Sequence, residues 1–217
     1  MEDYKREFIK FMCDSGVLTF GDFVTKSGRN TPYFVNTGNY RTGMQITALG
    51  EFYARCIKEN NLEADVLFGP AYKGIPLCVA VSTGLYNKYG TNVSYCFNRK
   101  EEKDHGEGGS LVGEKLKDGT RVIITEDVIT AGTAIREVLP ILRSAADVDI
   151  VGVVISVDRM EKGKNEKSAV QEVYEEFGIK VYPIVTILDI IEALKDGSVE
   201  GGEYLDKMIE YRNKYGV

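Results

Sequence analysis

Two acidic residues, Glu126 and Asp127, follow an apolar run at 122–125 and precede a stretch of small residues at 130–134. If the apolar run is a buried strand, the two carboxylates lie at its carboxyl end, where the ligands of parallel sheets bind. The small side chains would let an anion approach the free N–H groups of a following helix. Carboxylates that accept hydrogen bonds from hydroxyls, beside an anion cradle, indicate a sugar phosphate. An ordinary strand end with polar caps is the alternative for so short a motif.

Cations occur in two other segments. Lys73 follows a strand that ends near Gly69, so its ammonium would stand at the mouth of the next helix, where it could neutralise a phosphate. The segment 98–113 mixes charges and glycines and has almost no apolar residue, which is typical of an exposed, mobile loop. Its cations and its histidine are Arg99, Lys100, Lys103 and His105. Taken alone, these segments are more typical of a surface lysine and of a solvated charged loop than of a binding site.

The elements that would position these residues are short apolar runs that alternate with helical segments. The runs are nearly continuously apolar, which favours strands buried on both faces, as in a parallel sheet covered by helices. The expected strands are 66–69, 93–97, 122–125, 150–157 and 181–187. The expected crossover helices are 43–60, 74–88, 132–145 and 166–178. The sequence therefore predicts an α/β fold with a doubly wound, mainly parallel sheet flanked by helices.

The two ends of the chain depart from this alternation. Residues 1–40 combine an amphipathic helix with an aromatic, turn-rich stretch, and they are expected to form a small N-terminal lid beside a core at 41–217. The other end is expected to form two more helices, separated by glycines at 197 and at 201–202.

Composition excludes several classes of protein. The 217 residues suffice for one domain, and the hydrophobic share of 43% is ordinary for a packed globular chain. No apolar stretch reaches the roughly 18 to 20 residues of a membrane span, and the start is charged, so a cytoplasmic protein without membrane contact is expected. A net charge of −6 argues against binding to nucleic acid through a basic face. The four dispersed cysteines indicate buried thiols, with neither a zinc site nor disulfides.

Five blocks of the chain, in order, resemble a known family. The stretch VIITEDVITAGTA at 122–134 resembles the phosphoribosyl pyrophosphate signature of type I phosphoribosyltransferases. The other four blocks resemble those of the orotate phosphoribosyltransferases within that family. They are Lys26 with RNTPYFVNTG at 29–38, FGPAYKGIPL at 68–77, NRKEEKDHGEGG at 98–109 and SVDRME at 156–161. One departure is visible, because the family often has two aspartates where this chain has Glu126 and Asp127.

The resemblance implies roles for particular residues. The catalytic set would be Asp127, Lys103, Lys73, Glu126 and His105. Phosphoribosyl pyrophosphate would be bound by Lys26, Tyr72, Lys73, Arg99, Lys100, Lys103, His105, Glu126, Asp127, Val128, Ile129, Thr130, Ala131, Gly132, Thr133 and Ala134. Orotate would be bound by Lys26, Tyr33, Phe34, Thr130 and Arg159, whose guanidinium presents a planar fork of donors.

The resemblance also implies a reaction and an assembly. Orotate and phosphoribosyl pyrophosphate would give orotidine 5'-monophosphate and pyrophosphate, with Mg²⁺ held mainly by substrate and water rather than by protein ligands. A homodimer with shared active sites and a non-proline cis peptide, Ala71-Tyr72, are further implications. Two alternatives remain, a transferase for another base and a regulator that senses phosphoribosyl pyrophosphate. The regulator would need a basic surface or an added DNA-binding domain, and the acidic chain shows neither.

Overall fold

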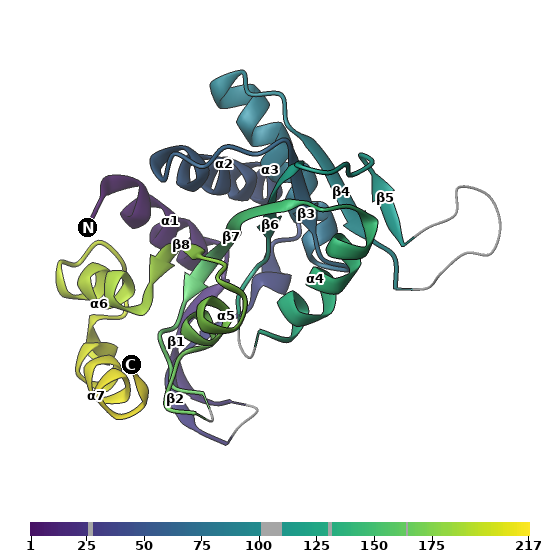
Figure 1. The fold of residues 1–217 in the computed structure, drawn as a ribbon. Coiled ribbons are helices and arrows are strands. Elements are labelled where there is room, and N and C mark those ends of the chain that lie inside the picture. Colours follow the sequence, from purple (N-terminus) through teal and green to yellow (C-terminus); the bar gives the residue numbers. More distant parts are fainter. Residues whose placement is uncertain (26–27, 101–109, 130–131, 164) are drawn as a thin grey trace.

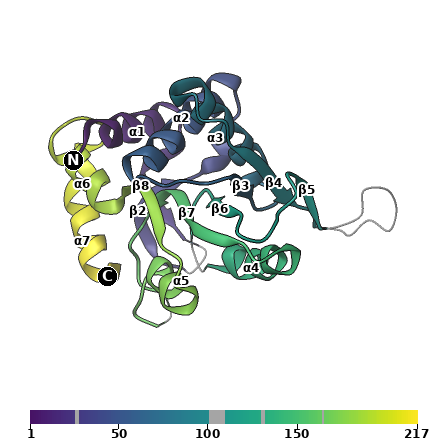
Figure 2. The ribbon, with the colours of Figure 1, turned by 45° about the horizontal axis from the view of Figure 1, so that its top comes forward.

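The computed structural model describes residues 1–25, 28–100, 110–129, 132–163 and 165–217. Within these ranges a six-stranded sheet, in the order β5-β4-β3-β6-β7-β8, lies between layers of helices (Figures 1 and 2). Its strands are β3 (Val66–Gly69), β4 (Ser94–Asn98), β5 (Leu111–Gly113), β6 (Arg121–Thr125), β7 (Asp149–Asp158) and β8 (Val181–Thr186). Five strands run parallel and β5 is antiparallel to β4, so the predicted doubly wound, mainly parallel sheet is confirmed.

The strand order places a crevice between β3 and β6. From β3 the chain crosses to β4 on one side, and β6, β7 and β8 then extend the sheet on the other side. The loops that leave β3 and β6 therefore diverge at their shared carboxyl edge, which is where open α/β sheets bind ligands. The residues that follow these two strands include Lys73 and the pair Glu126 and Asp127.

Helices cover both faces of the sheet. Helices α1, α2 and α3 pack on one face, and α4 and α5 pack on the other (Figure 2). Helices α6 and α7 lie beyond the β8 edge (Figure 1). Their bounds are α1 (Asp3–Asp14), α2 (Gly43–Glu59), α3 (Gly74–Tyr89), α4 (Thr133–Ala145), α5 (Ala169–Phe177), α6 (Ile187–Lys195) and α7 (Leu205–Tyr215).

Helices α2 and α3 approach each other through glycine. A Cβ at Gly50 would lie 2.3 Å from the Ala80 carbonyl oxygen, and one at Gly84 would lie 2.7 Å from the Gly50 carbonyl oxygen. Either side chain would force the helices apart. This close packing fixes α3, and with it the loop that precedes α3 at the site.

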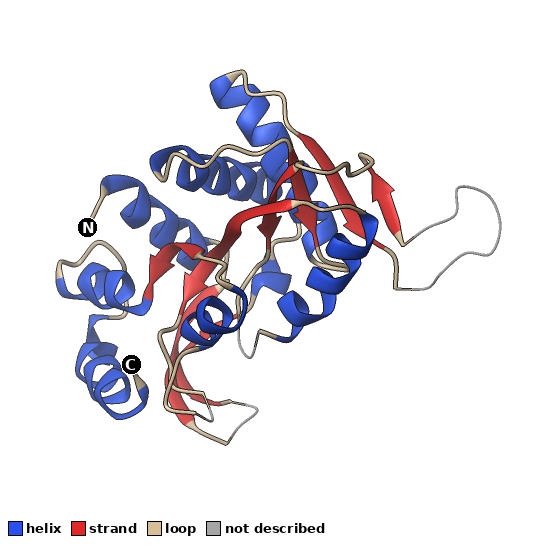
Figure 3. Ribbon diagram, in the orientation of Figure 1, coloured by secondary structure: helices blue, strands red, loops and turns tan. Residues whose placement is uncertain are grey.

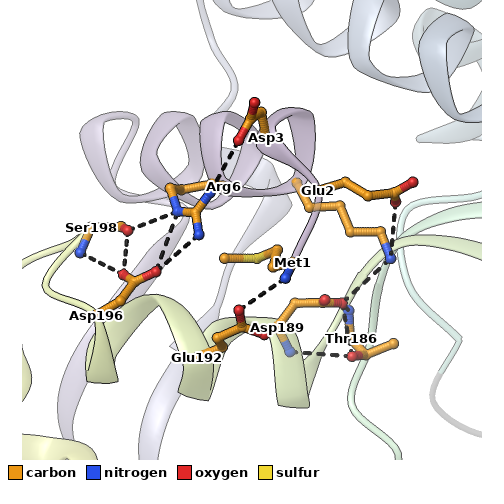
Figure 4. Close-up of polar contacts among 10 residues, drawn as sticks. Met1, Glu2, Asp3, Arg6, Thr186, Asp189, Glu192, Asp196 and Ser198 are labelled. Carbon is orange, nitrogen blue, oxygen red and sulfur yellow. Dashed lines mark hydrogen bonds and ion pairs between the residues drawn. The ribbon is translucent and has the colours of Figure 1, made fainter.

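The first forty residues contribute both to the core and to a separate small sheet. Tyr4, Phe8 and Ile9 of α1 belong to the same buried cluster as α2, β8 and α6. Polar contacts add to this packing: Arg6 Nη2 lies 3.0 Å from Asp196 Oδ2 (Figure 4). Strands β1 (Leu18–Val24) and β2 (Asn30–Val35) form an antiparallel hairpin outside the main sheet (Figure 3). Whether 1–40 acts as a lid stays a prediction.

Several boundaries differ from those expected. The predicted helix at 166–178 begins only at Ala169, because the Ser168 side chain accepts a hydrogen bond from the Gln171 amide and caps it. The predicted strand at 181–187 ends at Thr186, which caps α6 in the same way.

No helix in the described part of the chain is long and apolar enough to cross a membrane. Cys56, Cys78 and Cys96 are buried as expected, whereas Cys13 is half-buried.

Candidate active site

Asp127 and Lys73 face each other across the crevice. Lys73 Nζ lies 3.2 Å from Asp127 Oδ2, and it also donates to Thr37 Oγ1 at 3.1 Å. The Thr37 hydroxyl in turn donates to Asp127 Oδ2. Loops after β2, β3 and β6 therefore meet at one carboxylate, although they lie far apart in sequence.

The backbone around Asp127 is fixed as firmly as its side chain. The Val128 amide donates to Asp127 Oδ1 at 2.8 Å, and the Ser156 amide donates to the Asp127 carbonyl oxygen at 2.9 Å. The Tyr53 hydroxyl donates to the Glu126 carbonyl oxygen at 2.8 Å. The carboxylate is thus held in one orientation before any ligand binds.

The two adjacent acids have opposite electrostatic settings. Burial raises the pKa of Glu126 to about 8, helped by the charge of Asp127. Burial also opposes ionisation of Asp127, but the Thr37 hydroxyl, the Val128 amide and the Lys73 ammonium together hold the pKa of Asp127 below its ordinary value. The surroundings therefore disfavour the ionised form of Glu126 and favour that of Asp127.

A cavity of about 160 Å³ opens beside this carboxylate. Thr37, Lys73, Asp127 and Ser156 supply polar groups to its wall. Tyr40 also lines it, and the buried Tyr40 hydroxyl has no hydrogen-bond partner among the described residues.

The turn after β3 is packed so tightly that it requires glycine at both ends. A Cβ at Gly69 would lie 2.1 Å from the Gly74 carbonyl oxygen, and one at Gly74 would lie 2.7 Å from Pro70 Cδ. The Ala71-Tyr72 peptide is cis, as the family resemblance implied. The Tyr72 and Lys73 side chains project into solvent from this turn, which suits contact with a ligand.

The helix after β6 offers an anion site. Gly132 has a φ of +68° and immediately precedes Thr133, the first residue of α4. The amide groups of the first helical turn have no acceptor within the helix, and the helix dipole is positive there. Thr133 is exposed and Ala134 is small, so a phosphate could reach these amides. Thr130 and Ala131 lie outside the described residues.

Arg159 follows β7 beside a small cavity of about 80 Å³. Its Nε donates to Glu161 Oε1 at 2.9 Å and to the Tyr33 hydroxyl at 3.0 Å. Its Nη2 is buried and meets no acceptor at a hydrogen-bonding angle among the described residues, although Glu161 Oε1 is 2.7 Å away. Arg159 itself lines the cavity, so its guanidinium lies beside any ligand that enters there. Ile129 lines the same cavity, and its predicted contact with phosphoribosyl pyrophosphate stays a prediction.

The predicted orotate contacts Tyr33 and Phe34 differ in how far their side chains are exposed. The Tyr33 side chain is fully buried beneath Arg159, so in this structure it supports Arg159, and its own contact with a base stays a prediction. The Phe34 ring is 41% exposed and packs against Phe23. Lys26 lies outside the described residues.

The predicted cations of the 98–113 segment are only partly described. The Lys100 ammonium pairs with Glu137 of α4 at 3.2 Å rather than with the Asp127 cluster. The Arg99 amide donates to the Ser110 carbonyl oxygen at 2.8 Å, which closes the base of the segment. Lys103 and His105 lie outside the described residues.

Three residues of the site were not singled out from the sequence. Asn98 Oδ1 accepts from the Ala71 amide at 2.8 Å and so holds the turn before Lys73. Thr37 contacts both charged groups of the crevice, and Glu161 pairs with Arg159. Thr37 and Glu161 lie inside the quoted sequence blocks, but nothing in their spacing distinguished them from their polar neighbours.

Comparison with known proteins agrees with this geometry. The phosphoribosyl transferase domain model matches residues 36–188. The orotate phosphoribosyltransferases of Clostridium acetobutylicum and Clostridium beijerinckii are 55% and 56% identical to the chain, each over the full length of both proteins. The crystal structure of orotate phosphoribosyltransferase from Francisella tularensis is 40% identical with a TM-score of 0.86, covering 97% of this chain and 100% of that one. The chain belongs to the orotate phosphoribosyltransferase family.

Proposed function

We propose that this chain transfers the 5-phosphoribosyl group from phosphoribosyl pyrophosphate to orotate. The products are orotidine 5'-monophosphate and pyrophosphate, a step of de novo pyrimidine (UMP) biosynthesis. The observation that carries the proposal is the Lys73–Asp127 pair at the β3–β6 crevice, with an anion site at the start of α4. Because the chain is 55% identical over its full length to an orotate phosphoribosyltransferase, we assign orotate as the substrate of this site.

The charges of the crevice suit the reaction. As pyrophosphate leaves, negative charge grows on its oxygens and positive character grows on the ribose ring. Lys73, exposed at the turn after β3, is placed to move from Asp127 to the pyrophosphate. Asp127 then accepts hydrogen bonds from the ribose hydroxyls and faces the cationic ring, and Glu126 assists it. The first turn of α4 holds the 5'-phosphate.

The base end of the site selects an anionic heterocycle. The Arg159 guanidinium, which lines the 80 Å³ cavity, binds a carboxylate or carbonyl oxygen of orotate. Phe34 offers an exposed ring on the hairpin, and Lys26 and Thr130 complete the proposed set.

Mg²⁺ is the proposed cofactor. Glu126 and Asp127 present the oxygen ligands that this ion prefers, but no group of three or more acidic, histidine or cysteine side chains comes together among the described residues. We therefore assign most of its ligands to substrate oxygens and water. When bound, the ion neutralises charge on the departing pyrophosphate.

A homodimer and a cytoplasmic location complete the proposal. Large apolar side chains project from α2, from α3 and from the turn before α3, namely Met44 at 77% exposure, Tyr72 at 70% and Tyr86 at 60%. A groove of about 380 Å³ between the two helices, lined by Ile46, Pro76 and Val79, lies on the same pair of elements. Exposed apolar surface of this kind is typical of subunit interfaces.

One assay tests the reaction. Orotate absorbance should fall when the protein is mixed with phosphoribosyl pyrophosphate and Mg²⁺, and uracil, adenine and hypoxanthine should not replace orotate. Turnover of another base would instead identify a transferase for that base. Binding of phosphoribosyl pyrophosphate without any turnover would favour the regulator.

A further inference from the structure

The ion pair between Glu161 and Arg159 is the most enclosed one near the proposed base pocket. Both side chains are about four-fifths buried, with exposures of 19% and 20%. Two hydrogen bonds converge on one oxygen, Glu161 Oε1, from Arg159 Nε at 2.9 Å and from the Tyr33 hydroxyl at 3.0 Å, and Arg159 Nη2 lies 2.7 Å from the same oxygen as an ion-pair contact. The Glu161 carboxylate therefore binds the edge of the guanidinium that carries Nε and Nη2.

We infer that Glu161 is a positioning residue that sets the affinity of the site for orotate through Arg159. This inference rests on the proposed function. An arginine side chain has many rotamers. Restricting it to one rotamer during binding costs conformational entropy and therefore weakens affinity. Glu161 holds Arg159 in one orientation before the base arrives, so the guanidinium is already in place at the wall of the cavity.

Tyr33 also holds the Arg159 guanidinium, from the side that faces the core. Its ring lies under the guanidinium, with the Arg159 carbon 4.9 Å from the ring centroid, and its hydroxyl bridges Arg159 Nε and Glu161 Oε1. The Tyr33 ring itself packs edge-on against Tyr211 of α7, with centroids 6.0 Å apart. The hydrogen bonds thus fix the orientation of the guanidinium, and the Tyr33 ring fixes its distance from the core.

The backbone that carries the pair is held independently of the Glu161 side chain. The Val217 amide donates to the Met160 carbonyl oxygen at 2.9 Å, and the Lys162 amide donates to the Tyr215 carbonyl oxygen at 2.8 Å. Replacing the Glu161 carboxylate should therefore change the orientation of Arg159 without unfolding the turn.

The first test is Glu161→Gln, which keeps the shape but removes the charge. We expect KM for orotate to rise roughly tenfold, with kcat, KM for phosphoribosyl pyrophosphate and the unfolding midpoint nearly unchanged. Glu166→Gln is the matched control, because Glu166 lies five residues further along, pairs with Lys162 and is exposed. Its kinetic constants should equal those of the wild type. An unchanged KM for orotate in Glu161→Gln would overturn the inference.

A double-mutant cycle with Arg159→Ala separates positioning from a direct effect. If Glu161 acts through Arg159, then Glu161→Gln should add no further loss of orotate affinity once Arg159 is absent. Additive losses would overturn the inference. Should Arg159→Ala fail to fold, Tyr33→Phe serves instead, because it removes only the bridging hydroxyl. Failure of the wild type to consume orotate would refute the proposed function itself, whereas wild-type turnover with an unshifted variant refutes only the role of Glu161.

Discussion

Lys73 and Asp127 form an ion pair across the crevice, with Lys73 Nζ 3.2 Å from Asp127 Oδ2. The lysine is exposed, whereas the aspartate is mostly buried and accepts hydrogen bonds from the Thr37 hydroxyl and from the amide of its neighbour Val128. An incoming pyrophosphate can therefore draw the lysine away while the carboxylate stays in place. In the free protein, the two charged groups that the proposed reaction would use therefore neutralise each other.

Asp127→Asn should lower kcat far more than it changes KM. The negative charge matters most when the ribose ring becomes cationic, and loss of one preorganised interaction of this kind is typically about 3 to 4 kcal/mol, or a hundredfold or more in rate. Steady-state kinetics with both substrates measure this. Asp22→Asn is the control, since Asp22 also pairs with a lysine, Lys207, but on the surface. Wild-type kinetics in a folded Asp127→Asn variant would contradict the catalytic role.

Thr37→Val should lower kcat/KM by roughly 10- to 100-fold. Its hydroxyl donates to Asp127 Oδ2 and accepts from Lys73 Nζ, and a hydrogen bond to a charged group is worth about 1.5 to 3 kcal/mol. Thr37→Ser keeps the hydroxyl and should retain most activity. A serine variant as impaired as the valine variant would contradict this role of the hydroxyl, because serine keeps the hydroxyl and loses only the methyl group.

The raised pKa of Glu126 predicts a pH-dependent stability. In the unfolded chain this carboxyl ionises near its ordinary pKa of 4.5, whereas in the folded protein it keeps its proton up to about pH 8. The folded state binds more protons within that window, so the free energy of unfolding falls as pH rises through it. Glu126→Gln removes this penalty. Its stability advantage over the wild type should grow with pH, by at most about 1.4 kcal/mol per pH unit, and level off above pH 8.

Urea unfolding of the two proteins at several pH values between about 5 and 8 tests this prediction. Glu166→Gln is the control, because Lys162 lowers the pKa of the exposed Glu166 carboxyl, which is therefore ionised in both states across this range, so its stability difference from the wild type should barely change with pH. An advantage for Glu126→Gln that shrank with rising pH would show that Glu126 is ionised in the folded protein.

The parallel strands could be predicted because their burial on both faces leaves a nearly continuous apolar run. Strand β5 was missed because only Leu111–Gly113 pair with β4, at the edge of a segment that otherwise reads as loop. The β1–β2 hairpin was missed because its register shifts between Phe20 and Phe23, and the bulge breaks the alternation that would mark a strand.

Glu126 and Asp127 could be singled out from the sequence because they are adjacent and directly follow an apolar strand. Thr37 and Glu161 were missed because their partners come from the folded chain. Thr37 reaches a carboxylate 90 positions away, and Glu161 shares its oxygen with Tyr33, 128 positions away. No local pattern records such contacts, so these roles depend on the tertiary structure.

Gly132→Ala should weaken binding of ribose 5-phosphate by roughly tenfold. A left-handed backbone at a residue other than glycine costs about 1 to 2 kcal/mol. The new Cβ would also lie 3.2 Å from Val173 Cγ2, so the start of α4 would shift at the anion site. Gly178→Ala is the control, because Gly178 has the same φ of about +69° with open space around it and caps α5. Equal affinity of the two variants in calorimetry would refute the phosphate assignment.

The proposed homodimer with shared sites can be tested by mixing two inactive variants. Asp127→Asn damages the core of a site, and Lys103→Ala damages the loop that we propose reaches into the partner's site. After subunit exchange, the intact core of one chain meets the intact loop of the other in each mixed dimer. Random exchange makes about half of the dimers mixed, each with one wild-type site in two, so roughly a quarter of full activity should return. If each loop served its own subunit, every site would keep one lesion. Verified exchange without recovered activity would then refute the shared site while leaving the reaction assignment intact.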